Sequence, residues 1–221
     1  MEIKTIVNSL VDLFFPMRCI HCDDVIHSKQ TLCVLCVSEL PFTRWELDKK
    51  NKTYDQISQY CEIENACSLL HFTKTNVTQS ILHELKYKNR PELGILLADL
   101  VNIDLSQIDF VIPVPLHPKR YRKRGYNQIE LFTSELARLN HLNFNKDLLF
   151  RSKFNSSQVD KNKLDRIQAL ADAFVLKSIP EEGHYLIVDD LLTTGATLSQ
   201  AIRPFNQYPN VKVSVLTIGC A

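Results

Sequence analysis

A pair of adjacent carboxylates followed by a loop of small hydroxyl residues is the part of this sequence that most directly suggests chemistry. Asp189 and Asp190 come directly after the apolar run His184-Tyr-Leu-Ile-Val188, which predicts a buried strand. Ligands of open α/β sheets bind at the carboxyl ends of strands, so both carboxylates would face a ligand. The next residues offer hydroxyls, free backbone N–H groups and a glycine that permits close approach, which together suit a phosphate. This loop consists of Thr193, Thr194, Gly195, Ala196 and Thr197.

The loop differs from the two commonest nucleotide-binding loops. A Walker loop requires a Gly-Lys-Ser/Thr ending and the dinucleotide fingerprint requires G-x-G-x-x-G, and neither pattern follows the acidic pair. One alternative is an ordinary strand-loop-helix connection, in which the aspartates cap the turn and a threonine caps the helix. An isolated acidic pair or an isolated Thr-Thr-Gly would favour that alternative.

A second candidate site combines a proline-rich strand end with a dense run of cations. The segment 110–115 predicts a short buried strand that leads into a loop containing Pro113, Val114 and Pro115. Five of the six positions from 119 to 124 are cationic, a density that suits a di-anionic leaving group or a nucleic-acid backbone. The alternative is a solvated charged face. The cations are Lys119, Arg120, Arg122, Lys123 and Arg124.

Four of the seven cysteines form two C-x-x-C pairs that are ten residues apart. This spacing predicts a closed, tetrahedral site for structural Zn²⁺, and a module with so little core would need the metal to fold. Disulfides are disfavoured in the reducing cytosol that we expect for this chain, and the duplicated spacing disfavours free thiols. His21 and His27 could replace a ligand, but we expect them outside the ligand set. The predicted ligands are Cys19, Cys22, Cys33 and Cys36, whereas Cys61, Cys67 and Cys220 are predicted core residues.

Composition restricts the class of protein. The 221 residues include 26 basic and 25 acidic ones, so no long-range field attracts polyanions, and nucleic-acid binding would require a local patch. The apolar run 6–15 is too short to span a bilayer and has no cleavage site after it, so it predicts an amphipathic helix that Pro16 ends. We therefore expect a cytoplasmic protein without a membrane span.

Strand-like and helix-like segments alternate from Tyr60 onward. Strands are expected within 60–72, 110–115, 184–188 and 211–218, and helices around 81–85, 93–100, 129–139 and 196–206. This order predicts an α/β fold with a mainly parallel sheet flanked by helices. The polar stretch 46–59 is predicted to be a linker or a surface excursion. We therefore divide the chain into residues 1–45, an N-terminal helix with the four-cysteine module, and residues 60–221, the α/β domain.

Taken as one string, residues 186–198 closely resemble the signature of type I phosphoribosyltransferases, whose fold is Rossmann-like. In that family the acidic pair binds the ribose 2′- and 3′-hydroxyls of phosphoribosyl pyrophosphate (PRPP), and the Thr/Gly loop binds its 5′-phosphate. The resemblance implies these roles for Asp189 and Asp190 and for residues 193–197. It also implies Mg²⁺ bound with PRPP.

Further motifs make nearly the whole chain similar to the ComF family, which includes ComFC and GntX-like proteins. They are Pro-Val-Pro-Leu-His at 113–117, the basic run that ends in Arg-Gly-Tyr-Asn-Gln at 124–128, and the four cysteines. The pair Lys86-Tyr87 and the series Arg151, Gln158, Arg166 and Ala173-Phe174 also match, whereas Ala169 and Asp172 depart from the pattern.

The ComF resemblance implies further contacts to PRPP from Lys86, Arg120, Arg124 and residues 113–115. It implies a phosphoribosyltransferase (a pentosyltransferase) that releases pyrophosphate from PRPP and is linked to DNA uptake in natural transformation. The residues do not identify the acceptor. The alternatives are a non-catalytic competence factor that binds single-stranded DNA under control by PRPP, with other competence proteins as partners, and a fold that has lost catalysis.

Overall fold

The computed structural model describes residues 16–26, 30–88, 90, 92–151 and 174–221. The predicted N-terminal helix, His27, and the motif residues Gln158, Arg166, Ala169, Asp172 and Ala173 lie outside the described residues. No helix within the described ranges is long and apolar enough to cross a membrane.

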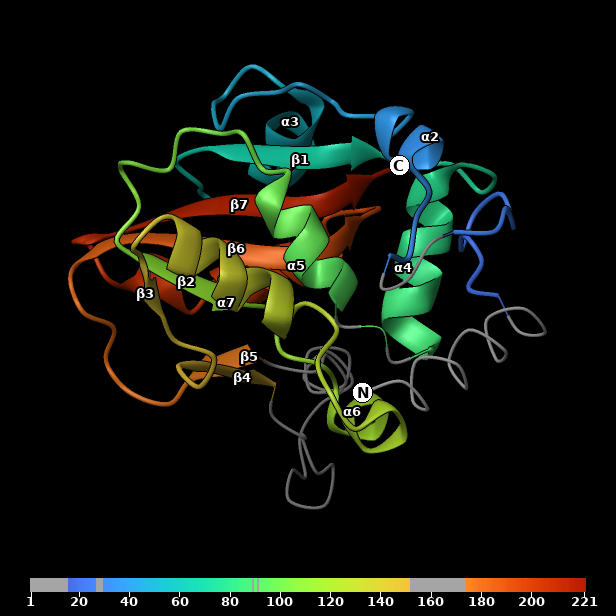
Figure 1. Cartoon of the computed structure of the whole chain (residues 1–221). Helices are drawn as coiled ribbons and strands as arrows, with labels where there is room; N and C mark the ends of the chain where they lie inside the picture. The colour runs from blue at the N-terminus through green and yellow to red at the C-terminus, as the bar shows by residue number, and fades with distance from the viewer. Residues whose placement is uncertain (1–15, 27–29, 89, 91, 152–173) are drawn as a thin grey trace, which may run out of the picture.

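A five-stranded sheet in the order β1-β7-β6-β2-β3 forms the centre of the molecule (Figure 1). Every neighbouring pair in it is parallel, which confirms the predicted mainly parallel sheet. The central strands are long apolar runs because both of their faces are covered. The strands are β1 (Ala66–His71), β2 (Phe110–Pro113), β3 (Asn143–Phe144), β6 (Gly183–Leu192) and β7 (Val211–Cys220).

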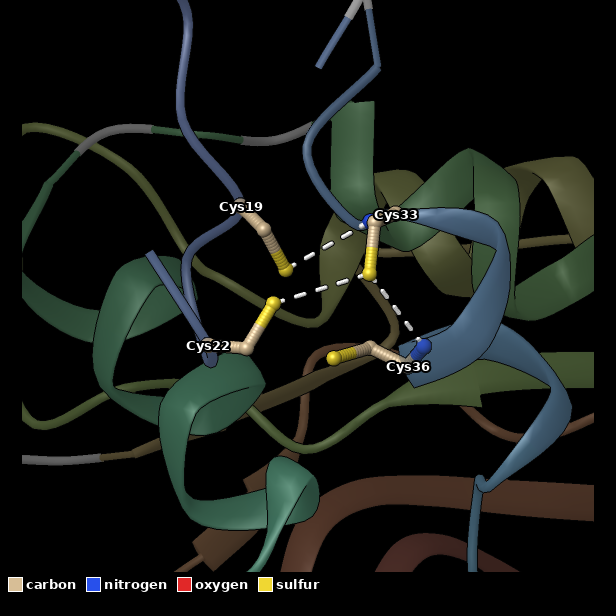
Figure 2. A group of neighbouring side chains, drawn as sticks. All are labelled: Cys19, Cys22, Cys33 and Cys36. Atoms are coloured by element: carbon tan, nitrogen blue, oxygen red, sulfur yellow. Dashed lines mark hydrogen bonds between the residues drawn. The ribbon is translucent and has the colours of Figure 1, made fainter. Parts of the chain in front are cut away.

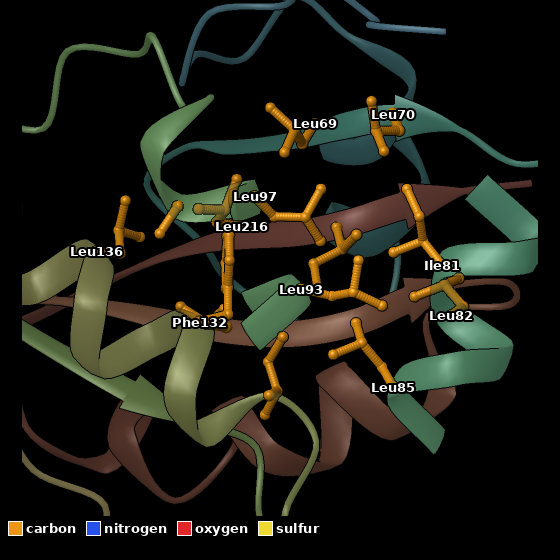
Figure 3. Close-up of a cluster of buried hydrophobic side chains, with 14 of the residues drawn as sticks. Leu69, Leu70, Ile81, Leu82, Leu85, Leu93, Leu97, Phe132, Leu136 and Leu216 are labelled. Carbon is orange, nitrogen blue, oxygen red and sulfur yellow. The ribbon is translucent and has the colours of Figure 1, made fainter. Parts of the chain in front are cut away.

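Three helices cover one face of the sheet: α4 (Val77–Tyr87), α5 (Glu92–Asp99) and α7 (Glu130–Leu139). Their apolar stripes bury side chains such as Leu85, Leu93 and Phe132 completely against alternate residues of β2, β6 and β7 (Figure 3). Burying a side chain of this kind contributes about 1.5–3 kcal/mol of transfer free energy. The predicted helices at these positions are confirmed.

The opposite face carries α3 (Lys52–Ser58), α9 (Ala196–Ile202) and the 3₁₀ helix η1 (Phe205–Gln207). The predicted helix 196–206 is interrupted. Pro204 has no N–H to continue the backbone hydrogen bonding, and η1 begins after it. Helices cover both faces, as the sequence predicts.

The prediction that residues 46–59 form a linker or a surface excursion is wrong. Thr53 and Ile57 of α3 are completely buried, and Asn51 is nearly so. The stretch looked exposed because it is polar, but its polar groups have partners: the Asn51 side chain donates to the Ala66 carbonyl at 2.7 Å and accepts from the Tyr54 N–H at 3.1 Å. The division into residues 1–45 and 60–221 stays a prediction.

Several further elements were not expected. The helix α2 (Val34–Ser38) lies in the cysteine segment, and the basic run forms the helix α6 (Pro118–Arg124). A separate antiparallel pair joins β4 (Leu149–Arg151) to β5 (Phe174–Leu176).

Candidate functional site

A cavity of about 580 Å³ lies beside the carboxyl ends of β2 and β6. Its volume is typical of a site for a small molecule. The cations that line it outnumber the carboxylates by five to two, so it favours an anionic ligand. Its lining residues are Lys86, Tyr87, Val114, Pro115, Leu116, Arg120, Lys123, Arg124, Tyr126, Gln128, Arg151, Asp189, Asp190, Leu191, Thr193 and Thr197.

Most of the residues predicted from the two sequence motifs meet at this cavity. Pro113 does not line it, because this residue is buried as the last residue of β2 and pairs with Val188. The middle of the loop, Thr194 to Ala196, lines an adjoining hollow of about 30 Å³ together with Asp189 and both flanking threonines. The roles that the resemblance implies for these residues stay predictions. Those that line the cavity are Lys86, Val114, Pro115, Arg120, Arg124, Asp189, Asp190, Thr193 and Thr197.

Asp190 is the centre of a polar network that joins three elements. It is 8% exposed, and its Oδ2 lies 3.1 Å from Lys86 Nζ of α4. The same oxygen accepts a hydrogen bond of 2.5 Å from Gln128 Nε2. Gln128 Oε1 in turn accepts from Arg124 Nη1 of α6 at 2.8 Å. The carboxylate on β6 is thereby connected to α4 and to the basic helix.

Asp189 has an unusual protonation equilibrium. Burial, followed by the negative charge of Asp190, raises the pKa of Asp189 to about 7, although Lys86 and Arg151 act in the opposite direction. The Asp190 N–H donates to Asp189 Oδ1 at 2.8 Å. Near neutral pH the Asp189 carboxyl is therefore present in both its protonated and its ionised form.

The basic run forms a helix because its ends are capped. His117 accepts from the Lys119 N–H at 3.1 Å, and Pro118 occupies the first turn, where its missing N–H costs nothing. Gly125 ends the helix with a φ of +80°, which glycine adopts without a steric penalty, and its N–H donates to the Tyr121 carbonyl at 2.7 Å. No residue of α6 is buried.

Two contacts tie the end of the basic helix to α4. The Arg124 guanidinium lies 5.2 Å from the centre of the Tyr87 ring, a cation–π contact. The Tyr126 hydroxyl donates to the Leu85 carbonyl at 2.6 Å. These contacts place Arg120, Lys123 and Arg124 at the mouth of the cavity.

Several lining residues were absent from the predicted site. Gln128 and Arg151 belong to motifs that carry the family resemblance, Lys123 belongs to the basic run, and Tyr87 follows Lys86. Each of these had a signal in the sequence. Leu116, Tyr126 and Leu191 also lie within quoted motifs, at 113–117, 124–128 and 186–198, but their residue types gave no reason to place them in the site.

The four predicted cysteine ligands form one compact group (Figure 2). Their sulfur atoms all lie within 4.8 Å of one another, close enough for four thiolates to share one ion. Cys22 Sγ and Cys33 Sγ are 3.6 Å apart. Burial raises the pKa of the Cys19 thiol, but backbone N–H groups of Cys22, Cys33 and His21 outweigh it and lower this pKa to about 6. The group could therefore hold a metal ion, as the spacing predicts.

His21 and the three cysteines outside the group lie where the sequence predicts. His21 Nδ1 makes a 3.0 Å hydrogen bond with Ser80 Oγ of α4 and is not one of the four grouped residues. Cys67 and Cys220 are buried, and Cys61 is partly buried against the core.

The chain is similar to proteins whose names refer to DNA utilization and competence. It is 27% identical over 197 residues to DNA utilization protein YhgH of an Escherichia coli strain, covering 82% of this chain and 81% of that protein. It is 27% identical over 208 residues to competence protein F of Haemophilus influenzae, covering 85% and 90% respectively. It is 33% identical over 95 residues to competence protein ComFC of Streptococcus pneumoniae, covering 43% and 40%.

No protein-family model matches the chain. Two solved structures are similar to it. The glutamine PRPP amidotransferase of B. subtilis has 16% identity and a TM-score of 0.39, covering 60% of this chain and 30% of that chain. The adenine phosphoribosyltransferase of Leishmania donovani has 13% identity and a TM-score of 0.33, covering 81% of this chain and 86% of that chain. The named relatives, rather than these structures, confirm the resemblance of the chain to the ComF family of competence proteins.

Proposed function

We propose that the cavity binds PRPP together with Mg²⁺ and that the protein is a phosphoribosyltransferase linked to DNA uptake. The observation that carries the proposal is that the basic helix, about 65 positions before the acidic pair in the sequence, meets the acidic pair and the Thr/Gly loop that follows it at one cavity. Asp189 and Asp190 would accept hydrogen bonds from the ribose hydroxyls, and residues 193–197 would bind the 5′-phosphate. Lys86 and the cations of α6 would bind the pyrophosphate.

The reaction breaks the bond between C1′ and the pyrophosphate oxygen and forms a bond between C1′ and a nucleophilic acceptor. Pyrophosphate leaves with the electron pair, and positive charge develops on the sugar in the transition state. Arg120, Lys123 and Arg124 would stabilise the departing anion, and the acidic pair would hold the ribose in place. Mg²⁺ bound with the substrate would neutralise part of the pyrophosphate charge. No covalent intermediate with the protein is required.

Calorimetric titration of the protein with PRPP and Mg²⁺ at several pH values tests this proposal. Because the pKa of Asp189 is raised to about 7, this carboxyl holds a proton below that pH in the unliganded site, and its ionised form accepts hydrogen bonds from the ribose more strongly than its protonated form. Affinity should therefore rise as the pH increases from 6 to 8, by up to about tenfold per pH unit below the pKa, and then level off. PRPP affinity of the Asp189→Asn variant, measured over the same pH range, gives the part of the pH dependence that comes from titration of PRPP itself. Absence of binding at every pH would refute the proposal.

We infer that the metal held by the cysteines is structural Zn²⁺. An all-sulfur set of four ligands is typical of zinc and of iron–sulfur centres, and the two C-x-x-C pairs have the spacing of a closed zinc site. Reduced thiols are consistent with the cytoplasmic location that we expect.

A second candidate function is the binding of single-stranded DNA, alone or with other competence proteins. It is favoured by the exposed cations of α6 and by Tyr121 beside them, whose side chain is half-exposed and could contact a base. The relatives are named for DNA utilization and competence, which agrees with this role. On this alternative, PRPP would regulate DNA binding instead of serving as a substrate.

The basic helix allows the two functions to be separated. Lys119 and Arg122 are exposed and do not line the cavity, whereas Arg120 and Lys123 do. Changing Lys119 and Arg122 to Gln should weaken binding to single-stranded DNA and reduce the slope of log K against log salt by about 0.7 per lost phosphate contact, without changing PRPP affinity. Fluorescence anisotropy over a range of salt concentrations measures this slope.

The matched control for that experiment is the double change Lys50→Gln with Lys74→Gln, which removes the same charge from exposed positions in other segments. If the change of Lys119 and Arg122 leaves DNA affinity unaltered, or if the control lowers it equally, α6 is not the DNA-binding element.

A further inference from the structure

The loop that follows the acidic pair is supported from outside the cavity by α3. The Gln56 side-chain amide donates a hydrogen bond to the Thr193 carbonyl, across 137 positions of sequence. The same helix lies against Gly195, where an added Cβ would meet the Gln56 carbonyl oxygen at 3.4 Å and Tyr60 Cδ2 at 3.7 Å. Gly195 has a φ of +77°, which other residues rarely adopt. The helix and the loop therefore pack closely.

The helix that carries Gln56 is held to the sheet by buried hydroxyl groups. Thr53 Oγ1 lies 2.6 Å from Ser68 Oγ of β1, which lies 2.6 Å from Thr217 Oγ1 of β7. Thr217 Oγ1 donates to the Gly219 carbonyl at 3.0 Å, and all three hydroxyl side chains are completely buried. A buried polar network in which the members have partners restrains the elements that it joins.

The apolar side of α3 adds a second attachment. Ile57, the residue after Gln56, is completely buried in the same cluster as Leu198 and Ile202 of α9, the helix that follows the loop. Both sides of the contact are thus held by other elements: α3 by the sheet and α9, and the loop by β6 and α9, which flank it. Gln56 projects from a restrained helix toward a restrained loop.

The hydrogen bond from Gln56 determines the orientation of one peptide group. The peptide between Thr193 and Thr194 is trans, so its carbonyl and its N–H point in opposite directions. With the carbonyl directed toward α3, the Thr194 N–H is directed away from it. If this peptide rotated, a carbonyl oxygen would face the bound anion in place of an N–H group, which would be repulsive.

We propose that Gln56 is a positioning residue for the phosphate loop, which keeps the Thr194 N–H available to the 5′-phosphate of the ligand. The inference rests on the proposed function and adds to it an element outside the cavity. Gln56 itself does not line the cavity, so it acts through the loop and not on the ligand.

The test compares two partial ligands, ribose 5-phosphate, which carries the phosphate that the loop would bind, and pyrophosphate with Mg²⁺, which does not. Gln56→Met removes the donor but keeps the chain length and the helix propensity. We expect it to weaken ribose 5-phosphate binding about tenfold, as for loss of one hydrogen bond to a charged group, and to leave pyrophosphate affinity unchanged. A general loss of structure would weaken the binding of both ligands. Calorimetry gives both affinities.

Gln59→Met is the matched control, because Gln59 lies one turn further along, is exposed, and donates to the Gln56 carbonyl at 3.0 Å without contacting the loop. Gln56→Glu is a second variant of similar size, and its ionised carboxylate should produce the same selective loss with a larger magnitude. If wild type binds ribose 5-phosphate and both Gln56 variants bind it equally well, the inference is wrong and the proposed function stands. If wild type binds neither PRPP nor ribose 5-phosphate, the proposed function fails and the inference with it.

Discussion

Changing both Asp189 and Asp190 to Asn should abolish measurable binding of PRPP with Mg²⁺. Each carboxylate would accept a charge-assisted hydrogen bond from a ribose hydroxyl, and such a bond contributes about 1.5–3 kcal/mol, so losing two weakens binding by about 100-fold or more. The loss also reaches the network, because Lys86 loses its ion-pair partner at 3.1 Å and Gln128 loses its charged acceptor. Isothermal titration calorimetry of the double variant measures the effect.

The variant should keep its affinity for single-stranded DNA, since removing two negative charges beside the basic helix does not remove a phosphate contact. Asp99→Asn with Asp104→Asn provides a control of equal charge change at exposed positions outside the cavity. PRPP affinity within about threefold of wild type in the Asp189/Asp190 variant would show that the ribose binds elsewhere.

The sequence predicted well those elements whose side-chain periodicity reflects burial on a single face or on both faces. Apolar residues recur at helical spacing in α4, α5 and α7 because one stripe of each helix packs on the sheet, as in Leu82 and Leu85, Leu93 and Leu97, and Phe132 and Leu136. The strand β6 is apolar because it is covered on both sides. The helix α3 was missed for the opposite reason. Thr53 and the N-cap Asn51 are buried, although their polarity indicates exposure unless their hydrogen-bond partners are known.

The site was predictable in its parts but not in its connections. Asp189, Asp190 and the Thr/Gly loop form a continuous string, and five cations are conspicuous in any sequence. The hydrogen bond from Gln128 to Asp190 spans 62 positions, and the one from Tyr126 to the Leu85 carbonyl spans 41. Only the order of the strands brings these residues together. The basic run forms a helix because His117 and Gly125 cap its two ends, and its cations did not indicate this.

The cysteine group is connected to the ligand cavity through α4. Cys19 and Cys36 belong to the same buried cluster as Ile81 and Leu85 of that helix, and His21 hydrogen-bonds Ser80 near its beginning. The other end of α4 carries Lys86, the ion-pair partner of Asp190. The cysteine module and the Lys86 side of the cavity are thus joined by one helix of eleven residues.

Changing Cys36 to Ser should release the metal and lower the thermal stability of the protein by about 10 °C or more. Isolated zinc modules gain about 10–16 kcal/mol from the metal, and losing even a few kcal/mol of this shifts the unfolding midpoint of a domain this size by about 2–4 °C per kcal/mol. Metal analysis and circular dichroism measure the two effects. Cys61→Ser is the control, because Cys61 is a partly buried thiol outside the group of four. Equal metal content and equal midpoints in both variants would mean that the four thiols hold no structural ion, and that the core formed by Cys19, Cys36 and α4 is stable without one.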